Sequence, residues 1–181
     1  MKTKIFSTLL ILLSLSACAT MIGDRTVNVT GDQIAQKLNE KLALPISLLK
    51  VFDVNVSNSV VTFDKTTGRM TTTMDTKLSS QMLDKTLLGK LGISGKLRFD
   101  AATSTVVLDE PNIENIHFDG ADSKFNDVFN AMAKTVGSEM LNGLTLYTVK
   151  PEDLKFGGTT YAPKDMLVTD NGLQLTLTPA K

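Results

Sequence analysis

Few side chains in this chain of 181 residues could do covalent or acid–base chemistry. His117 is the only histidine, and the acidic residues nearest to it are Glu114 and Asp119. Their spacing matches no common pattern of zinc or calcium ligands. Asp109 and Glu110 are adjacent, so in a strand their carboxylates would point to opposite faces and could not share a proton. We therefore expect no catalytic site, no metal site and no bound cofactor.

The only cysteine, Cys18, stands at the end of a secretory pattern. A positively charged start precedes an apolar run from Ile5 to Leu15, which is shorter than the roughly 20 residues of a membrane-spanning helix. The next residues, S-A-C, resemble a lipobox, in which small residues precede a cysteine that is acylated and becomes the new N-terminus. We expect a signal peptide over 1–17 and acyl chains, palmitate among them, on Cys18. Ordinary cleavage after Ala17 with a free thiol is the alternative.

Behind this signal we expect a tether over 18–24 and one domain over 25–181, which is long enough to enclose a sizeable core. Cleavage would remove two lysines, so acidic residues would slightly outnumber basic ones in the remainder. No basic stripe or run is present, which argues against a nucleic acid partner. The acyl chains on Cys18 would hold the protein to a membrane, since each buried methylene contributes about 0.8 kcal/mol.

Two segments have the periodicity of amphipathic helices. In the shorter one, over 30–42, apolar residues recur every four positions, and Thr30 and Gln33 have the spacing of a capping box. The longer one, over 123–142, carries an apolar stripe opposite a polar face that includes Asn130. Both helices are predicted to bury one side only.

Over 48–118 the period changes to two, as in strands with one buried face, and the alternation is clearest over 70–78. Three glycines over 89–95 permit strong curvature or the close approach of a neighbouring strand. A β tail with a long loop over 150–163 and a hairpin at 171–172 ends the chain. The sum predicts an α+β fold, in which a strongly curved antiparallel β-sheet is wrapped around the long amphipathic α-helix, with a second, shorter N-terminal helix.

The order of these features resembles the YceB-like bacterial lipoproteins, a family of uncharacterised function. The resemblance is carried by the lipobox, a T-x-x-Q-I-x-x-x-L-N helix from Thr30 to Asn39, a V-L-D-E-P-N-I strand from Val107 to Ile113, and an L-Y-T-V strand from Leu146. Members of that family look like half of a tubular lipid-binding domain, with an apolar channel between sheet and helix. The resemblance implies an apolar ligand in the same place and brings no catalytic residues.

Methionines are consistent with such a ligand site, because their flexible, polarisable side chains suit surfaces that adapt to varied apolar molecules. Met70 and Met74 share one face of a predicted strand, and Met132 and Met140 share the stripe of the long helix. The alternative is that they simply fill the core. The residues expected to face the ligand are Met70, Met74, Leu91, Ile93, Phe125, Phe129, Met132 and Val136.

Together these features suggest a non-enzymatic envelope lipoprotein that binds a lipid or other apolar ligand. Ala19 favours the periplasmic face of the outer membrane, since aspartate at that position favours inner-membrane retention in many Gram-negative bacteria. One alternative is a structural or interaction accessory with a solid core, which docks on another envelope protein through the 150–163 loop. An envelope hydrolase built around His117 has the least support.

Overall fold

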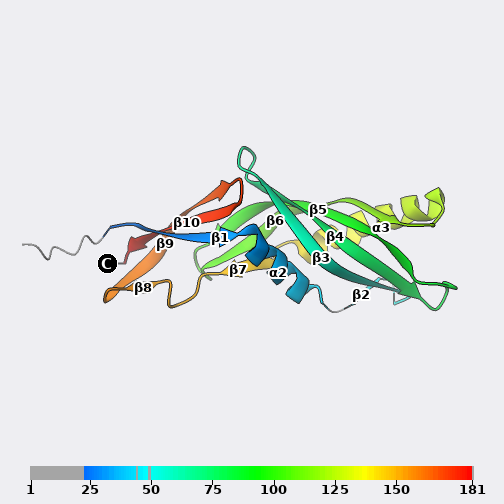
Figure 1. The fold of residues 1–181 in the computed structure, drawn as a ribbon, viewed down its shortest axis with the longest axis horizontal. Helices are drawn as coiled ribbons and strands as arrows, with labels where there is room; N and C mark the ends of the chain where they lie inside the picture. Colours follow the sequence, from blue (N-terminus) through cyan, green and yellow to red (C-terminus); the bar gives the residue numbers. More distant parts are fainter. Residues whose placement is uncertain (1–22, 44, 49, 181) are drawn as a thin grey trace, which may run out of the picture.

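The computed structural model describes residues 23–43, 45–48 and 50–180, which form ten strands and two helices. The predicted signal peptide, Cys18 and Ala19 lie outside the described residues. Figure 1 shows an elongated molecule whose long strands run roughly along its length. Neither helix of the described part combines the length and the apolar character needed to cross a bilayer.

The larger sheet has six antiparallel strands in the order β2-β3-β4-β5-β6-β7. Each strand pairs with the next one along the chain, and only between β6 and β7 does a helix intervene. The strands are β2 (Ile46–Leu48), β3 (Phe52–Asp64), β4 (Arg69–Ser80), β5 (Leu87–Asp100), β6 (Thr105–Phe118) and β7 (Thr145–Thr148).

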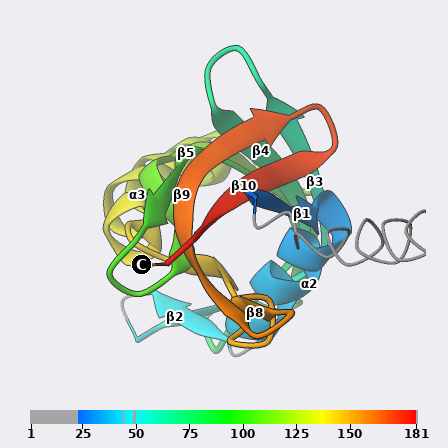
Figure 2. The same ribbon diagram turned by 90° about the vertical axis from the view of Figure 1, so that its left-hand side faces the viewer.

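The smaller sheet joins the two ends of the described chain, in the order β1-β10-β9-β8. Its strands are β1 (Arg25–Thr30), β8 (Lys155–Phe156), β9 (Thr159–Thr169) and β10 (Gly172–Pro179). All six residues of β1 pair with β10, and Figure 2 shows these two strands side by side. The predicted loop over 150–163 is wrong in part, because β8 and the start of β9 lie within it.

One face of each long strand builds the core. In β4, Met70, Met74 and Leu78 are completely buried, whereas Thr71 and Thr73 on the other face are exposed. This confirms the predicted alternation. Buried side chains of β1 and β10 belong to the same apolar cluster as those of the larger sheet, so the two sheets share one core.

Two of the glycines of β5 mark places where β6 comes very close. A Cβ atom on Gly89 would lie 1.9 Å from the backbone oxygen of His117, and one on Gly95 would lie 2.5 Å from Cδ1 of Leu108. Neither distance leaves room for a side chain. The close approach predicted from the glycine spacing is therefore confirmed.

The shorter helix, α2 (Gly31–Lys41), begins at the predicted capping box. The backbone N–H of Thr30 donates to Oε1 of Gln33 at 2.8 Å, and the N–H of Gln33 donates to Oγ1 of Thr30 at 3.3 Å. Ile34 and Leu38, one turn apart, are buried and belong to the shared core. The helix packs chiefly against β3.

The longer helix, α3 (Ser123–Leu141), lies along the free edge of β6. Asn126 accepts from the N–H of Phe118 at 2.9 Å and donates to its carbonyl at 3.4 Å. Asn130 accepts from the N–H of Ile116 and donates to its carbonyl, both at 2.7 Å. The spacings match, because four helical residues rise about 6 Å and two strand residues about 6.7 Å. Two side-chain amides thus take the place of a neighbouring strand.

This arrangement overturns the predicted fold class. Over the described residues the protein is mostly β, with two curled sheets and two short helices, and no sheet there wraps around a single long helix. The physical reason is that α3 satisfies the edge of β6 with its own amides, so it sits beside the sheet. The prediction had a single sheet, whereas β1 and β10 pair with each other in a second one.

Replacing Asn126 with alanine should destabilise the protein by about 2 to 4 kcal/mol, because the N–H and carbonyl of Phe118 would lose their partner in a buried place. Urea unfolding followed by circular dichroism measures this difference. Asn28→Ala, at an exposed position of β1, is the control and should change stability little. Equal stability of the two variants would show that the amide pairing contributes nothing.

Two threonines on the inward face of β4 bury hydroxyls without partners. Thr72 is 0% exposed and Thr76 is 3% exposed, and no hydrogen-bond partner for either Oγ1 lies within the described structure. Thr72→Val and Thr76→Val keep the shape and remove the unpaired hydroxyl, so each should stabilise the fold by about 1 kcal/mol. Thermal unfolding would reveal this as a higher midpoint. A lower midpoint would mean that the hydroxyls have partners in solution.

Candidate functional site

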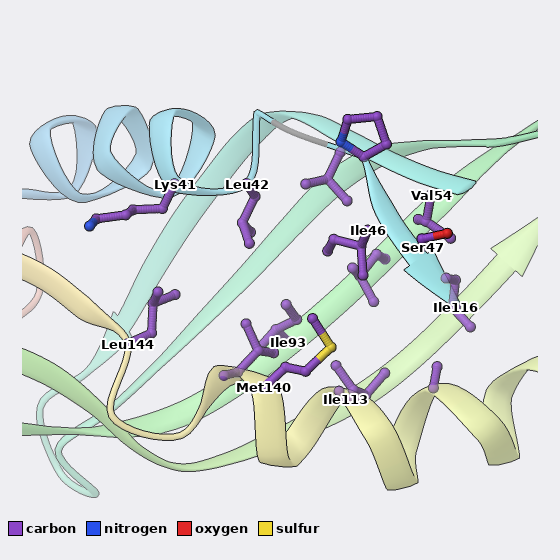
Figure 3. Close-up of a pocket in the computed structure, with 16 residues that line it drawn as sticks. Lys41, Leu42, Ile46, Ser47, Val54, Ile93, Ile113, Ile116, Met140 and Leu144 are labelled. Carbon is purple, nitrogen blue, oxygen red and sulfur yellow. The ribbon is translucent and has the colours of Figure 1, made fainter. Parts of the chain in front are cut away.

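An apolar cavity of about 350 Å³ lies where the two helices meet the larger sheet. Its wall is formed by the end of α2, by β2, β3, β5 and β6, and by the second half of α3. Figure 3 shows side chains from the α2–β2 side and from the α3 side converging on the same space. A volume of this size falls at the lower end of the range for small-molecule sites.

The floor of the pocket is built from the inward faces of the strands. Val54 in β3, Ile93 in β5, and Ile113 and Ile116 in β6 line it and are at most 4% exposed. The strand pairing brings Ile93 opposite Ile113, which places these branched side chains next to each other. The floor is therefore buried, closely packed and apolar.

The rim is built from less buried residues near the ends of the helices. Leu42 follows the last turn of α2, and Ile46 in β2 is held over the sheet by its pairing with Val54. Both side chains are half-buried. Met140, near the end of α3, is 55% exposed and lines the pocket from the other side. A flexible thioether at the rim can move aside for a ligand.

Two polar side chains, Lys41 and Ser47, stand among the sixteen lining residues shown in Figure 3. Lys41 ends α2, and its ammonium group is turned away from the apolar interior in Figure 3. Lys41 thus borders the pocket with an exposed side chain. The described lining residues include no acidic side chain.

The eight predicted ligand residues are divided between the pocket and the solid core. Leu91 and Ile93 line the pocket. Met70 and Met74 are 0% exposed and belong to the core cluster, outside the lining. The four predicted residues of α3 also lie outside the lining and pack against the core or within it: Phe125, Phe129, Met132 and Val136.

An aromatic cluster fills the space between the first half of α3 and the larger sheet. Phe129 is 5.1 Å from Phe118 and 5.6 Å from Phe52 between ring centroids, both in edge-to-face contact. Phe125 stacks on Phe129 at 5.8 Å. These rings close the space between α3, β3 and β6 at that end. The pocket begins beyond them, at Ala133 and Gly137, where α3 carries small residues.

Sequence reasoning missed the part of the pocket that comes from the end of α2 and from β2. The periodicity includes Leu42 in the predicted helix over 30–42, and it predicts no role for Ile46. The available signal was the nearly continuous apolar stretch over 42–49, which is too short for another helix and does not alternate. Such a stretch indicates burial on more than one side.

A polar cluster on the outer face of the larger sheet is the most connected group of titratable residues. Ser94 donates to Glu114 at 2.5 Å, Arg69 donates to Ser94 at 3.2 Å, and Asn112 donates to Glu114 at 3.0 Å. The hydrogen bonds from Ser94 and then Asn112 lower the pKa of Glu114 below its usual value. A carboxylate of this kind is a weak base near neutral pH. The cluster ties β4, β5 and β6 together.

The single histidine lies at the surface near the end of β6. His117 Nε2 is 3.7 Å from an oxygen of Asp119, and both side chains are largely exposed. Glu114 is engaged instead with Ser94. In the described ranges, no three His, Cys, Asp or Glu side chains are grouped as metal ligands.

The fold and the pocket define a mostly β protein with two curled sheets and one apolar cavity framed by two helices. A family model matches residues 29–171, and the chain belongs to that family, described as protein of unknown function (DUF1439). No curated protein matches the chain.

One solved structure shows a distant similarity to the chain. It is a crystal structure of lipopolysaccharide binding protein, with 10% sequence identity and a TM-score of 0.32. The match covers 86% of this chain and 40% of that protein, so the chain spans less than half of its length. A similarity at this level is too low to support a conclusion about function.

Ser94→Ala should raise the pKa of Glu114 toward its ordinary value, because the hydroxyl stabilises the ionised carboxyl. Since the folded pKa is lowered, the stabilisation is present above the ordinary pKa and is lost as the pH falls through the lowered one. Carbon-detected NMR titration of the Glu114 carboxyl measures the shift. Ser57→Ala, at an exposed position of β3, should leave it unchanged. An unchanged titration in Ser94→Ala would contradict the assignment.

Proposed function

We propose that this protein binds a lipid or another apolar ligand in the pocket between α2, β2, α3 and the larger sheet, and that it acts without catalysis. The observation that carries this proposal is the unfilled apolar volume of about 350 Å³ above a buried floor. Empty volume of this kind lowers stability, because its walls lack contact partners. An apolar ligand would supply those contacts, and each methylene buried would contribute about 0.8 kcal/mol.

The architecture supports a ligand site of this kind. The floor consists of paired strands, and where β6 has no second strand neighbour its edge is bonded to Asn130 of α3, which holds the floor in place. The rim consists of residues near the end of α2, in β2 and at Met140, whose flexible side chain can adjust to the shape of the occupant. A preformed apolar site with an adaptable entrance suits a carrier that takes up and releases its ligand.

We further propose that the protein is a YceB-like lipoprotein, with a signal peptide over 1–17 and acyl chains on Cys18. The support is the pattern of charge, apolar run and lipobox in the sequence. Pairing in the smaller sheet begins at Arg25, so only the residues over 18–24 would separate the lipid from the fold. Ala19 supports placement at the periplasmic face of the outer membrane.

A second candidate function, docking on another envelope protein, is favoured by apolar side chains at the end of the molecule remote from the smaller sheet. Val51 and Met82 are 39% and 77% exposed and border one hollow beside the end of β4. Leu88, at the start of β5, is 60% exposed. Crosslinking in cells would favour this function if it captured one stoichiometric protein partner that is lost in Met82→Ser.

The carrier proposal is tested by purifying the protein without its lipid anchor, extracting it with organic solvent and analysing the extract by mass spectrometry. A co-purified lipid, together with binding of the neutral fluorescent probe phenylnaphthylamine, is the expected result. An extract without lipid and a probe that stays dim would contradict the proposal. The probe has no charge, so it reports the apolar volume alone.

Ala133→Phe should abolish binding of the probe, since Ala133 lines the pocket and is only 8% exposed. The larger ring would occupy the cavity, at a cost in stability of about 1 to 3 kcal/mol if it overpacks. Ala131→Phe is the matched control, because Ala131 lies on the exposed side of the same helix. Fluorescence titration compares the two variants. Equal binding by both would place the probe elsewhere.

A further inference from the structure

The charge distribution around the pocket bears on the chemical class of its ligand. Lys41 is the only charged residue among the described lining residues, and it stands at the rim. Every other side chain that lines the cavity is apolar, apart from the hydroxyl of Ser47. An occupant would therefore meet an apolar interior and one positive charge near the entrance.

Lys41 has no carboxylate partner within ion-pair distance among the described residues. The nearest acidic residue along the chain, Glu40, is engaged on both oxygens. Its Oε2 accepts from Nζ of Lys37 at 3.1 Å, and its Oε1 accepts from Nε2 of Gln36 at 3.1 Å. Both oxygens of Glu40 therefore already accept hydrogen bonds from other side chains, and Lys41 forms no ion pair with it within 4.0 Å in the described structure.

Lys41 stands where the apolar wall of the pocket meets solvent. Lys41 borders the apolar wall, and its exposed side chain extends away from the pocket in Figure 3. A ligand with a chain inside the cavity would leave its head group at this border, still in contact with water. An anionic head would be attracted there, and a cationic head would be repelled.

We propose that the ligand is a single-chain amphiphile with an anionic head, held with its chain in the pocket and its head beside Lys41. This inference rests on the proposed function and names the class of its ligand. The cavity of about 350 Å³ limits the occupant to one chain of moderate length. A carboxylate or a phosphate would satisfy the same charge, and the test below separates them.

Competition with phenylnaphthylamine tests the proposal in wild-type protein at low salt. The competitors are lauric acid, dodecyl phosphate, methyl laurate and dodecyltrimethylammonium, all below the concentrations at which they form micelles. The two anions should bind about three- to fivefold more tightly than the methyl ester, as expected for an exposed charge pair. This advantage should shrink as salt is added. A tighter carboxylate would indicate a free fatty acid, and a tighter phosphate a phospholipid-derived head.

Variants assign the effect to one residue. Lys41→Met keeps a long unbranched side chain and should remove the advantage of the two anions over methyl laurate, measured as the ratio of their affinities in the same variant. Lys41→Arg should keep it. Both variants report binding separately from stability, since Lys41 also lies near the negative end of the α2 dipole. Lys77→Met, at an exposed position on the outer face of β4, is the matched control and should behave as wild type.

The outcomes separate this inference from the proposed function. Equal binding of lauric acid and methyl laurate, or an anion advantage that survives in Lys41→Met, would overturn the anionic head and leave the apolar site in place. Failure of all four competitors and of the probe would overturn the apolar site itself, and this inference with it.

Discussion

The position of α3 depends on two asparagine amides that replace a missing strand. One edge of β6 pairs with β5, and the first residues of its other edge pair with β7. Further along that second edge, the backbone groups of Ile116 and Phe118 are hydrogen-bonded to Asn130 and Asn126. A buried edge without such partners would be costly, since each unpaired backbone group costs about 1 to 3 kcal/mol. The amides therefore fix the position of α3 along β6 and its rotation about its own axis. The aromatic rings of its first turns fill the space beside it.

The cavity follows from this placement. Because α3 is held at the edge of the sheet, it covers the curled inner face only in part. The aromatic rings close one end of that face, and beyond them the helix carries Ala133 and Gly137, which add no large side chain to the pocket. At Gly137 the helix lies so close to β6 that a Cβ atom would be 3.0 Å from the side chain of Ile113. The end of α2 and the short strand β2 approach from the other side without filling the gap. The result is a cavity with buried isoleucines at its floor and with the ends of α2 and α3 and the strand β2 at its rim.

Local signals in the sequence predicted the features that depend on neighbouring residues. The capping box at Thr30, the alternation along β4 and the close approach at Gly89 all follow from residue types at short spacing. The pairing of β1 with β10 and the docking of α3 depend on residues far apart, and periodicity shows which side is buried without showing what covers it. Asn130 was assigned to the polar face for this reason, since its partner lies on a distant strand. Periodicity also could not show which buried residues line a cavity, and six of the eight predicted ligand residues pack in or against the core outside the lining.

The strand order of the smaller sheet has a consequence for the biogenesis of the chain. β1 finds its strand neighbour in β10, so residues 25–30 remain unpaired until the ribosome has made the segment 172–179. The strands β2 to β6 of the larger sheet each pair with the next one along the chain, so their hairpins need only segments that are made early. The smaller sheet is therefore the last part of the described fold to be completed.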